Sequence, residues 1–376
     1  MTAADADQAS RRAALAMAFA LPGDATIYLL LPLYAANFGV TLPEAGFLLA
    51  ANRLVRIAGY GWVAHFYATR GPRTACFIAT IAAALSTLGY WIGTGIWVLL
   101  VARLMWGLAF AALNIANQAL PTASTENASR RAGRARSIVA VGPMLGLLGG
   151  AIVADMYGPR VVFLILGVAA CIAPLFTLRL PSVPEAFHPQ GPRFAWPSSL
   201  NLWSFAQGLT LDGIFVFGLS LLAASHLPKG AVIAAGTALA LRYAVEIVFS
   251  PVGGQLAQRH GARRMVVMLS LASSASLALL GAQGAILWVG NIATIVLRAL
   301  MQPLPGPVVA ETFGQDARVG ALAAQATWRD IGAGAGPLVA GFLLPIAAPV
   351  LIYGASAALL AATSTMLSRE QQAPRT

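Results

Sequence analysis

The sequence predicts an all-α integral membrane protein with twelve transmembrane helices arranged as two pseudo-symmetric six-helix lobes. Three observations support this fold class: a high apolar content, basic residues gathered at alternate helix connections, and a similarity between the two halves of the chain. Of 376 residues, 58% are hydrophobic and only 10% are charged, whereas soluble domains carry about 25% charged residues. At roughly 30 residues per span and loop, this length accommodates about twelve helices.

The same composition excludes several classes of function. A net charge of +11 suggests nucleic-acid binding in a soluble protein, but here the excess consists of arginines in helix connections. The two cysteines, Cys76 and Cys171, lie in apolar segments without metal-ligand spacing, and four scattered histidines add no metal site. The sequence contains no recognisable nucleophile–base set or phosphate-binding loop. We therefore expect neither an enzyme nor a protein with a metal or another cofactor.

The first helix is expected to remain uncleaved. Arg11 and Arg12, followed by an apolar run, resemble the start of a signal peptide. Apolar residues resume after Asp24, however, and continue to Phe38. This is far beyond the roughly 7–15 residues of a signal-peptide core.

The apolar segments form two sets of six. A polar, proline-rich stretch at residues 181–197 separates them and indicates a linker. We assign residues 1–180 to an N-terminal lobe, residues 181–199 to a cytoplasmic linker and residues 200–376 to a C-terminal lobe. The twelve helices are expected near residues 13–37, 43–67, 74–94, 96–120, 136–157, 161–180, 200–225, 229–252, 264–282, 285–309, 319–345 and 347–367.

Basic residues give the orientation, because connections rich in arginine and lysine stay in the cytoplasm. With the N-terminus in the cytoplasm, sixteen basic residues lie on that side and two, Arg160 and Lys229, lie outside. We therefore expect a protein of the cytoplasmic (inner) membrane with both termini in the cytoplasm. The sixteen are Arg11, Arg12, Arg70, Arg73, Arg130, Arg131, Arg134, Arg136, Arg179, Arg193, Arg259, Arg263, Arg264, Arg318, Arg369 and Arg375.

The two halves also resemble each other in sequence. When the halves are aligned on Gly71 and Gly261, two polar or charged positions of the second helix of each half coincide, and charged residues occupy similar places in the first and fourth helices. Such internal duplication is typical of two-lobed transporters whose site lies at the lobe interface. Asn52 coincides with Arg242 and Arg56 with Glu246, while Asp24 and Asp212 occupy similar places in the first helix of each half, and Arg103 and Arg298 in the fourth.

Residues 254–264, GQLAQRHGARR, resemble the cytoplasmic loop signature of the major facilitator superfamily. Gly254 lets two helices approach, while Gly261 and Arg263 shape and anchor the loop. Gln258 stands where the family has an acidic residue, and Ala68 does so in the weaker N-terminal copy. The charge-relay latch that the family has at this loop is therefore not expected in its usual form.

A second resemblance lies in the predicted fourth helix, where Arg103 is followed four residues later by Gly107. In this family the arginine is linked to proton coupling. Alternatively, Arg103 caps backbone carbonyls and has a structural role. Both interpretations stay open, since a charge within the membrane is a functional hypothesis by default.

A third resemblance is the fifth-helix motif of the drug–proton antiporter branch. It is carried by GPMLGLLGG at residues 142–150, with Gly142, Pro143 and Gly146, and is echoed at residues 332–341 by Gly336 and Pro337. Small residues at this spacing form a groove in which helices pack closely. The resemblance as a whole covers nearly the whole chain and implies the major facilitator fold.

Charged residues within the predicted spans should face a wet cavity rather than lipid, because a charge at the bilayer centre costs roughly 2.5–3.5 kcal/mol even on lenient scales. Each is either an inter-helix ion-pair partner or a ligand contact. The pair Arg329–Asp330 belongs either to this cavity or to the cytoplasmic end of its helix. The candidates for proton coupling are Asp24, Asp212, Glu246 and Arg103, and those for substrate binding are Arg53, Arg56, Arg242, Arg298, Asn52, Asn114 and Trp106.

The arginine excess favours an anionic or zwitterionic substrate, because guanidinium binds carboxylate or phosphate in bidentate fashion. The family resemblance implies alternating access, and its antiporter branch implies proton-coupled efflux of a small, amphiphilic organic molecule. Uptake of an organic anion is the alternative transport function. A non-transporting membrane sensor or assembly factor on the same fold is the alternative from another class. We expect a monomer in the lipid bilayer, with a small-molecule substrate and protons as partners and no nucleic acid.

Overall fold

Long helices bring the charged residues of the chain to its centre. The computed structural model describes residues 1–183, 197–226 and 231–369, and within these ranges every regular element is a helix. Most of the expected linker, together with Arg193, Lys229 and Arg375, lies outside the described residues. The elements are α1 (Ala3–Ala20), α2 (Pro22–Leu33), η1 (Ala35–Phe38), α3 (Leu42–Ile92), α4 (Ile96–Ala119), α5 (Ala128–Tyr157), α6 (Pro159–Ala170), α7 (Ala173–Thr177), α8 (Ser199–Gln207), the π-helix η2 (Gly208–Ile214), α9 (Phe215–His226), α10 (Ala231–His260), α11 (Ala262–Leu279), α12 (Ala285–Met301), α13 (Pro305–Thr312), α14 (Gln315–Leu343) and α15 (Pro349–Arg369).

Several of these helices are suited to cross a bilayer. Eight helical stretches of the described chain are long and apolar enough, and the bent pair α12–α13 makes a ninth. The 51-residue α3 consists of two helices joined at a kink at Gly71. The protein is thus an integral membrane protein. The predicted number of twelve helices stays a prediction, since α10 and α14, with charges near their middle, are not among these spans.

Three helices begin earlier than the sequence suggested. The first starts at Ala3 instead of residue 13, because the Thr2 side chain and Asp5 form a capping box at its N-terminus. Helix α5 starts at Ala128 instead of residue 136, and α14 starts at Gln315 instead of residue 319. Both shifts place charged residues deeper inside the bundle than their expected positions.

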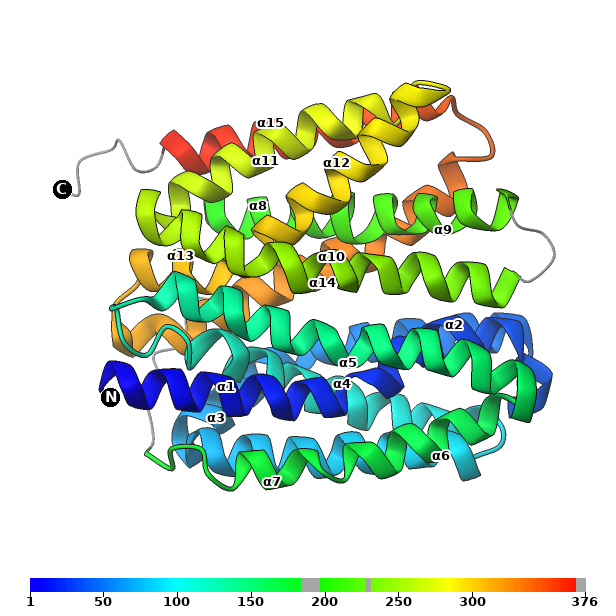
Figure 1. Cartoon of the computed structure of the whole chain (residues 1–376), viewed down its shortest axis with the longest axis horizontal. Coiled ribbons are helices and arrows are strands. Elements are labelled where there is room, and N and C mark those ends of the chain that lie inside the picture. The colour runs from blue at the N-terminus through cyan, green and yellow to red at the C-terminus, as the bar shows by residue number, and fades with distance from the viewer. Residues whose placement is uncertain (184–196, 227–230, 370–376) are drawn as a thin grey trace.

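The helices form two groups that lie side by side (Figure 1). Helices α1–α7 lie in one group and α8–α15 in the other, and α5 packs along α10 while α3 packs along α14. We refer to residues 1–180 as the first half and to residues 200–376 as the second half. The N-terminus and the Arg369 end of α15 lie at the same end of the bundle (Figure 1).

The two halves share backbone irregularities at corresponding places. Gly71 and Gly261, on which the halves were aligned, have φ of 80° and 87°, in the left-handed region that glycine tolerates. The first long helix of each half is also interrupted. In the first half α1 gives way to α2 at Pro22, and in the second half the π-helix η2 follows α8.

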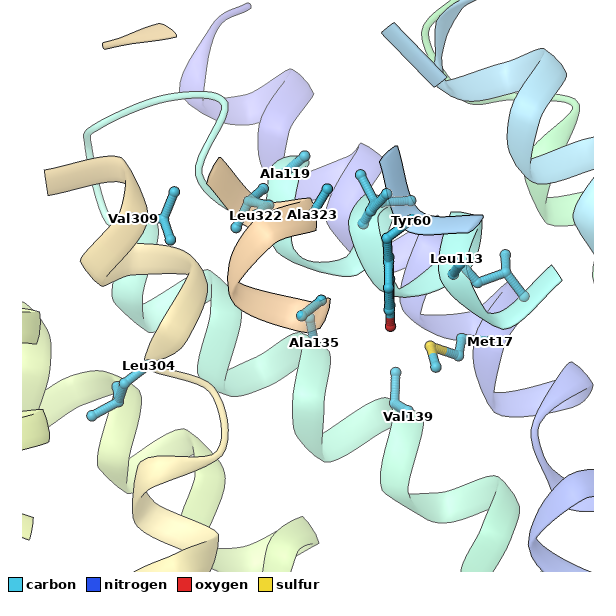
Figure 2. Close-up of a cluster of buried hydrophobic side chains, with 14 of the residues drawn as sticks. Met17, Tyr60, Leu113, Ala119, Ala135, Val139, Leu304, Val309, Leu322 and Ala323 are labelled. Atoms are coloured by element: carbon cyan, nitrogen blue, oxygen red, sulfur yellow. The ribbon is translucent and has the colours of Figure 1, made fainter. Parts of the chain in front are cut away.

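A buried apolar cluster links the two halves near the α4–α5 connection. Figure 2 shows part of it: Met17, Tyr60 and Val139 of the first half lie close together, and Leu322 of the second half lies beside Ala119 of the first. The backbones of α5 and α10 also touch, since a Cβ added at Gly133 would lie 2.6 Å from the carbonyl oxygen of Ser250. This end of the bundle is therefore closely packed across the seam between the halves.

Candidate functional site

A polar cavity of about 230 Å³ lies between the two halves. Its wall is formed by α2, α3, α4 and α5 of the first half and by η2, α9, α10, α12 and α14 of the second. Apolar and aromatic side chains alternate there with charged ones. The charged residues in the wall are Asp24, Arg53, Arg56, Arg136, Asp212, Arg242, Arg298, Arg329 and Asp330.

Asp24 and Arg103 form a buried ion pair in the first half. Asp24 lies in the first turn of α2, just after the break at Pro22, and its Oδ1 lies 2.5 Å from Arg103 Nη1. The Nδ2 of Asn52 donates to the same oxygen at 3.1 Å. Arg103 Nε also donates to the carbonyl oxygen of Leu48 at 3.1 Å. Arg103 thus has both geometries expected for it, an ion pair and a capped carbonyl.

Gly107 explains the spacing of the fourth-helix motif. A Cβ added at this position would lie 2.8 Å from the carbonyl oxygen of Asn52 and 3.0 Å from its Oδ1. Glycine therefore lets α4 approach α3 at the residue that donates to Asp24. Arg103 and Gly107 act together, since Arg103 binds Asp24 and Gly107 makes room for Asn52, which donates to Asp24.

Asp212 forms the corresponding pair in the second half, within η2. Its Oδ1 lies 2.6 Å from Nη2 of Arg298, and its Oδ2 lies 2.8 Å from Nη2 of Arg329. The side-chain amides of Gln207 and Gln302 donate to it at 3.1 and 3.2 Å. Asp212 therefore binds two arginines, whereas Asp24 binds one.

Glu246 joins the two halves through Arg136. Its Oε2 accepts hydrogen bonds from Nη2 and Nε of Arg136 at 2.5 and 2.9 Å, while its Oε1 accepts one from Arg298 at 2.6 Å. The Glu246 side chain is fully buried. Because Arg136 belongs to α5 and Glu246 to α10, this ion pair crosses the seam.

A second ion pair crosses the seam between α3 and α14. Arg56 Nε lies 3.0 Å from Oδ2 of Asp330, and the hydroxyl of Tyr60 donates to the same carboxylate at 3.1 Å. The Arg56 guanidinium also lies 4.2 Å from the ring centroid of Phe110. Each of the two ion pairs across the seam therefore joins an arginine of the first half to a carboxylate of the second half.

Arg53 and Arg242 differ from the other arginines of the wall. Within the described residues, neither lies within ion-pair distance of a carboxylate. Arg242 instead lies over the ring of Tyr243, 4.6 Å from its centroid. Both side chains are half-buried and line the cavity.

The remaining candidates are placed as follows. Asn114 lines the cavity and donates to the Tyr60 hydroxyl at 3.3 Å. Asn52 is fully buried and reaches the cavity through the wall residues Asp24 and Tyr28, to which its Nδ2 donates. Trp106 is 1% exposed in the apolar core and is not part of the cavity wall, because its face of α4 points into the first half. Sequence spacing alone could not tell the cavity-facing side of a helix from the side that points into the core of the first half.

One residue of the site was not expected from the sequence, and one alternative that the sequence left open is decided. Arg136, counted among the cytoplasmic arginines, lies in the cavity wall, since α5 begins eight residues earlier at Ala128. The pair Arg329–Asp330 also belongs to the cavity, where the two residues bind Asp212 and Arg56. The early start of α5 accounts for Arg136, whereas Arg329 and Asp330 lie in the middle of α14. A helical reading of the basic run from Arg130 would have placed Arg136 in the membrane.

The fifth-helix motif and its echo are at helix contacts. A Cβ added at Gly146 would lie 2.9 Å from Cβ of Pro22, and Gly142 faces the backbone of Ala18. In the second half, Gly336 faces Gly213 in η2. Pro143 and Pro337 lie inside α5 and α14, next to these contacts. The motif thus packs against the same segments that present Asp24 and Asp212.

The loop signature also has structural contacts. Gly254 faces the carbonyl oxygen of Ser129 across the seam, and Gly261 forms the turn between α10 and α11. Arg263 Nη2 donates to the carbonyl oxygen of Leu367 at the end of α15 at 2.6 Å. These residues lie away from the cavity. In the described part of the chain, no three His, Cys, Asp or Glu side chains are arranged to hold a metal ion.

Comparisons with known proteins agree with this architecture. A search of curated proteins by sequence finds no match. The crystal structure of the human organic anion transporter MFSD10 (TETRAN) has the same fold, with a TM-score of 0.78 and 14% identity over 96% of this chain and 99% of that chain. The proton:xylose symporter XylE bound to 6-bromo-6-deoxy-D-glucose gives a TM-score of 0.75 and 11% identity over 97% of this chain and 95% of that chain.

The family assignment comes from the sequence profile of the Major Facilitator Superfamily, which matches residues 13–229. The match covers more than half of the 376 residues. It includes the Asp24–Arg103 pair, the fifth-helix motif and the first helix of the second half. The chain belongs to the major facilitator superfamily and is a membrane transporter.

Proposed function

We propose that the protein is a secondary transporter of a small organic anion that works by alternating access. The observation that carries this proposal is the charge around the cavity. Seven arginines surround it, counting Arg103 behind Asp24, against four carboxylates, counting Glu246, which leaves an excess of three positive charges. Arginine has no accessible neutral form. An anionic substrate is therefore the natural counter-charge.

The rest of the wall favours an amphiphilic anion. Phe110 and Tyr243 lie beneath arginines, and Leu147, Val216 and Leu239 add apolar surface. Ligand sites of this kind hold the apolar body of a molecule by burial and fix its orientation through a few polar groups. The shared fold with a human organic anion transporter is in keeping with this substrate class.

We further propose that transport is proton-coupled efflux and that Asp24 is the first candidate for the proton carrier. Only the carboxylates can exchange protons here, since every base in the wall is an arginine. Asp212 and Glu246 each bind two arginines, whereas Asp24 binds one arginine and one amide. Neutralising Asp24 therefore leaves one arginine without its acid, whereas neutralising Asp212 or Glu246 affects two; Asp330 likewise binds one arginine, Arg56. The fifth-helix motif, which packs on the Asp24 segment, is the sequence feature that favours efflux.

Alternating access would occur by rocking of two lobes, residues 1–180 and 200–376, about the seam. The ion pairs Arg136–Glu246 and Arg56–Asp330 cross that seam, so each would break or re-form as the lobes move. We propose that the protein acts as a monomer in the inner membrane. Its termini and the 181–199 linker would lie in the cytoplasm.

Two other functions make different predictions. Uptake of an organic anion would use the same arginines, and the direction of a pH gradient that drives accumulation separates it from efflux. A non-transporting sensor or assembly factor would bind the anion without moving it. Transport by reconstituted protein excludes this second alternative.

The experiment compares ligands of one shape and different charge on purified full-length protein. Benzoate, benzylamine and glucose are tested for thermal stabilisation, and each is then offered to proteoliposomes with an imposed pH gradient. We expect stabilisation and transport with benzoate alone, and weaker stabilisation with slower transport in Arg53→Gln. Arg134→Gln is the matched control, because Arg134 lies on α5 with an exposed side chain. Equal stabilisation by benzylamine contradicts the proposal.

A further inference from the structure

Arg53 and Arg242 are positioned to bind charges that the protein itself does not supply. Each lies in the cavity wall, and within the described residues neither has a carboxylate at ion-pair distance. The other five arginines around the cavity all bind an acid. These pairs are Arg103 with Asp24, Arg298 and Arg329 with Asp212, Arg136 and Arg298 with Glu246, and Arg56 with Asp330.

The two arginines come from opposite sides of the seam. Arg53 belongs to α3, and its side chain reaches α14, where its Cδ lies 3.7 Å from the position of a Cβ added at Gly334. Arg242 belongs to α10, and its Nε is buried without a hydrogen-bond partner in the described structure. Its closest acid along the helix, Glu246 one turn later, already binds Arg136 and Arg298.

Closure of the cavity makes these charges costly. An occluded state removes water from both guanidinium groups, and a buried charge without a partner is strongly unfavourable. Neither group can lose its proton to avoid this. A ligand with one negative charge compensates only one of them. A ligand with two negative charges compensates both and can also connect the two halves.

We propose that the substrate is an organic dianion whose two negative charges neutralise Arg53 and Arg242. This inference rests on the proposed function, because it specifies the anion that the transporter carries. The apolar and aromatic side chains of the same cavity wall, including Tyr28, Phe110 and Leu239, hold the organic part of the ligand. The two charges belong either to two carboxylates or to one phosphate monoester.

Matched ligands test the number of charges. Affinities of purified full-length protein are measured for phthalate against benzoate and for adipate against hexanoate, and phenyl phosphate tests a single doubly charged group. We expect at least one dianion to bind about tenfold or more tightly than its singly charged partner, as one additional charged hydrogen-bonded contact predicts. Tighter binding of phthalate than benzoate, or of adipate than hexanoate, indicates two carboxylates. Tighter binding of phenyl phosphate than benzoate indicates a phosphate monoester.

Variants then connect the preference to the two arginines. Arg53→Gln and Arg242→Gln should each abolish most of the affinity difference between the preferred dianion and its singly charged counterpart, while the control Arg134→Gln keeps it. Equal affinity of wild-type protein for mono- and dianions overturns the inference but leaves anion transport intact. A dianion preference that survives in both variants also overturns it. If no anion in the set binds the wild-type protein, the proposed function fails together with the inference.

Discussion

Asp24 of α2 and Arg103 of α4 meet at 2.5 Å, and Asp212 and Arg298 repeat this contact at 2.6 Å in the second half. In both halves the acid lies where the first long helix is interrupted, at Pro22 or within η2. Backbone irregularities within the membrane are tolerated where they line a cavity. The duplicated chain therefore places one acid–arginine pair on each side of the same cavity.

The two acids should respond differently to neutralisation. In Asp24→Asn we expect pH-driven accumulation to be lost while benzoate still binds and still exchanges across the membrane, because the amide cannot carry a proton. Accumulation and exchange in proteoliposomes measure this. Simultaneous loss of binding, exchange and folding would indicate a structural pair. Full proton-driven transport by the variant would transfer the coupling role to Asp212 or Glu246.

Asp212→Asn is the comparison for this variant. It leaves Arg298 and Arg329 facing one fewer carboxylate, whereas Asp24→Asn affects only Arg103. We expect a larger fall in melting temperature for Asp212→Asn than for Asp24→Asn, since unpaired buried charges are destabilising. A larger fall in melting temperature for Asp24→Asn would argue against the view that Asp212 stabilises two arginines and Asp24 only one.

The packing of the fifth-helix motif can be tested with an internal control. Leucine at Gly146 or Gly336 should lower the melting temperature or hold the protein in one conformation, because each position faces the segment that carries Asp24 or Asp212. Leucine at Gly149 should have little effect, since a Cβ there meets nothing within 4 Å. If all three variants melt and transport like the parent, the packing account is wrong.

The ion pair between Arg56 and Asp330 predicts that the effects of their substitutions on melting temperature are not additive. Arg56→Gln or Asp330→Asn alone leaves a buried charge without its partner, and loss of such a partner costs about 3–5 kcal/mol. The double variant removes both charges, so its fall in melting temperature should be smaller than the sum of the single falls. A strictly additive double variant would show that the two residues do not interact in the membrane.

The orientation can be tested at Ser182, an exposed residue at the start of the expected linker. A cysteine at this position, in a protein whose Cys76 and Cys171 are replaced by serine, should react with an impermeant thiol reagent only after the membrane is opened. The bias of arginine and lysine toward one set of connections predicts this result. Labelling from outside intact cells would invert the proposed topology.

Much of this site could be predicted from the sequence. The chain repeats an acid in the first helix and an arginine in the fourth helix of each half, so Asp24–Arg103 and Asp212–Arg298 follow from the duplication once the fold is known. Glycines at regular spacing likewise predicted the close contacts of Gly146 and Gly336. These features depend on local sequence patterns that occur once in each half of the chain.

Other parts of the site depended on where helices begin. Arg136 follows three arginines and looks like part of a basic loop, yet it lies eight residues, or about 12 Å, inside α5. Asp330 lies fifteen residues, or about 22 Å, inside α14, so the pair that it forms with Arg329 reaches the cavity. Pairing between halves, as in Arg136–Glu246, depends on how the two halves dock. The sequence of neither half alone contains that information.

The most direct test of anion transport through this cavity is counterflow in proteoliposomes. Radiolabelled benzoate and phthalate are each offered to vesicles preloaded with the same unlabelled anion, with wild-type, Arg53→Gln and Arg134→Gln proteins compared. We predict rapid exchange of at least one anion by wild-type and Arg134→Gln, and exchange reduced about tenfold or more in Arg53→Gln. Absence of exchange for both anions with well-folded wild-type protein, or unchanged exchange in Arg53→Gln, would contradict the account.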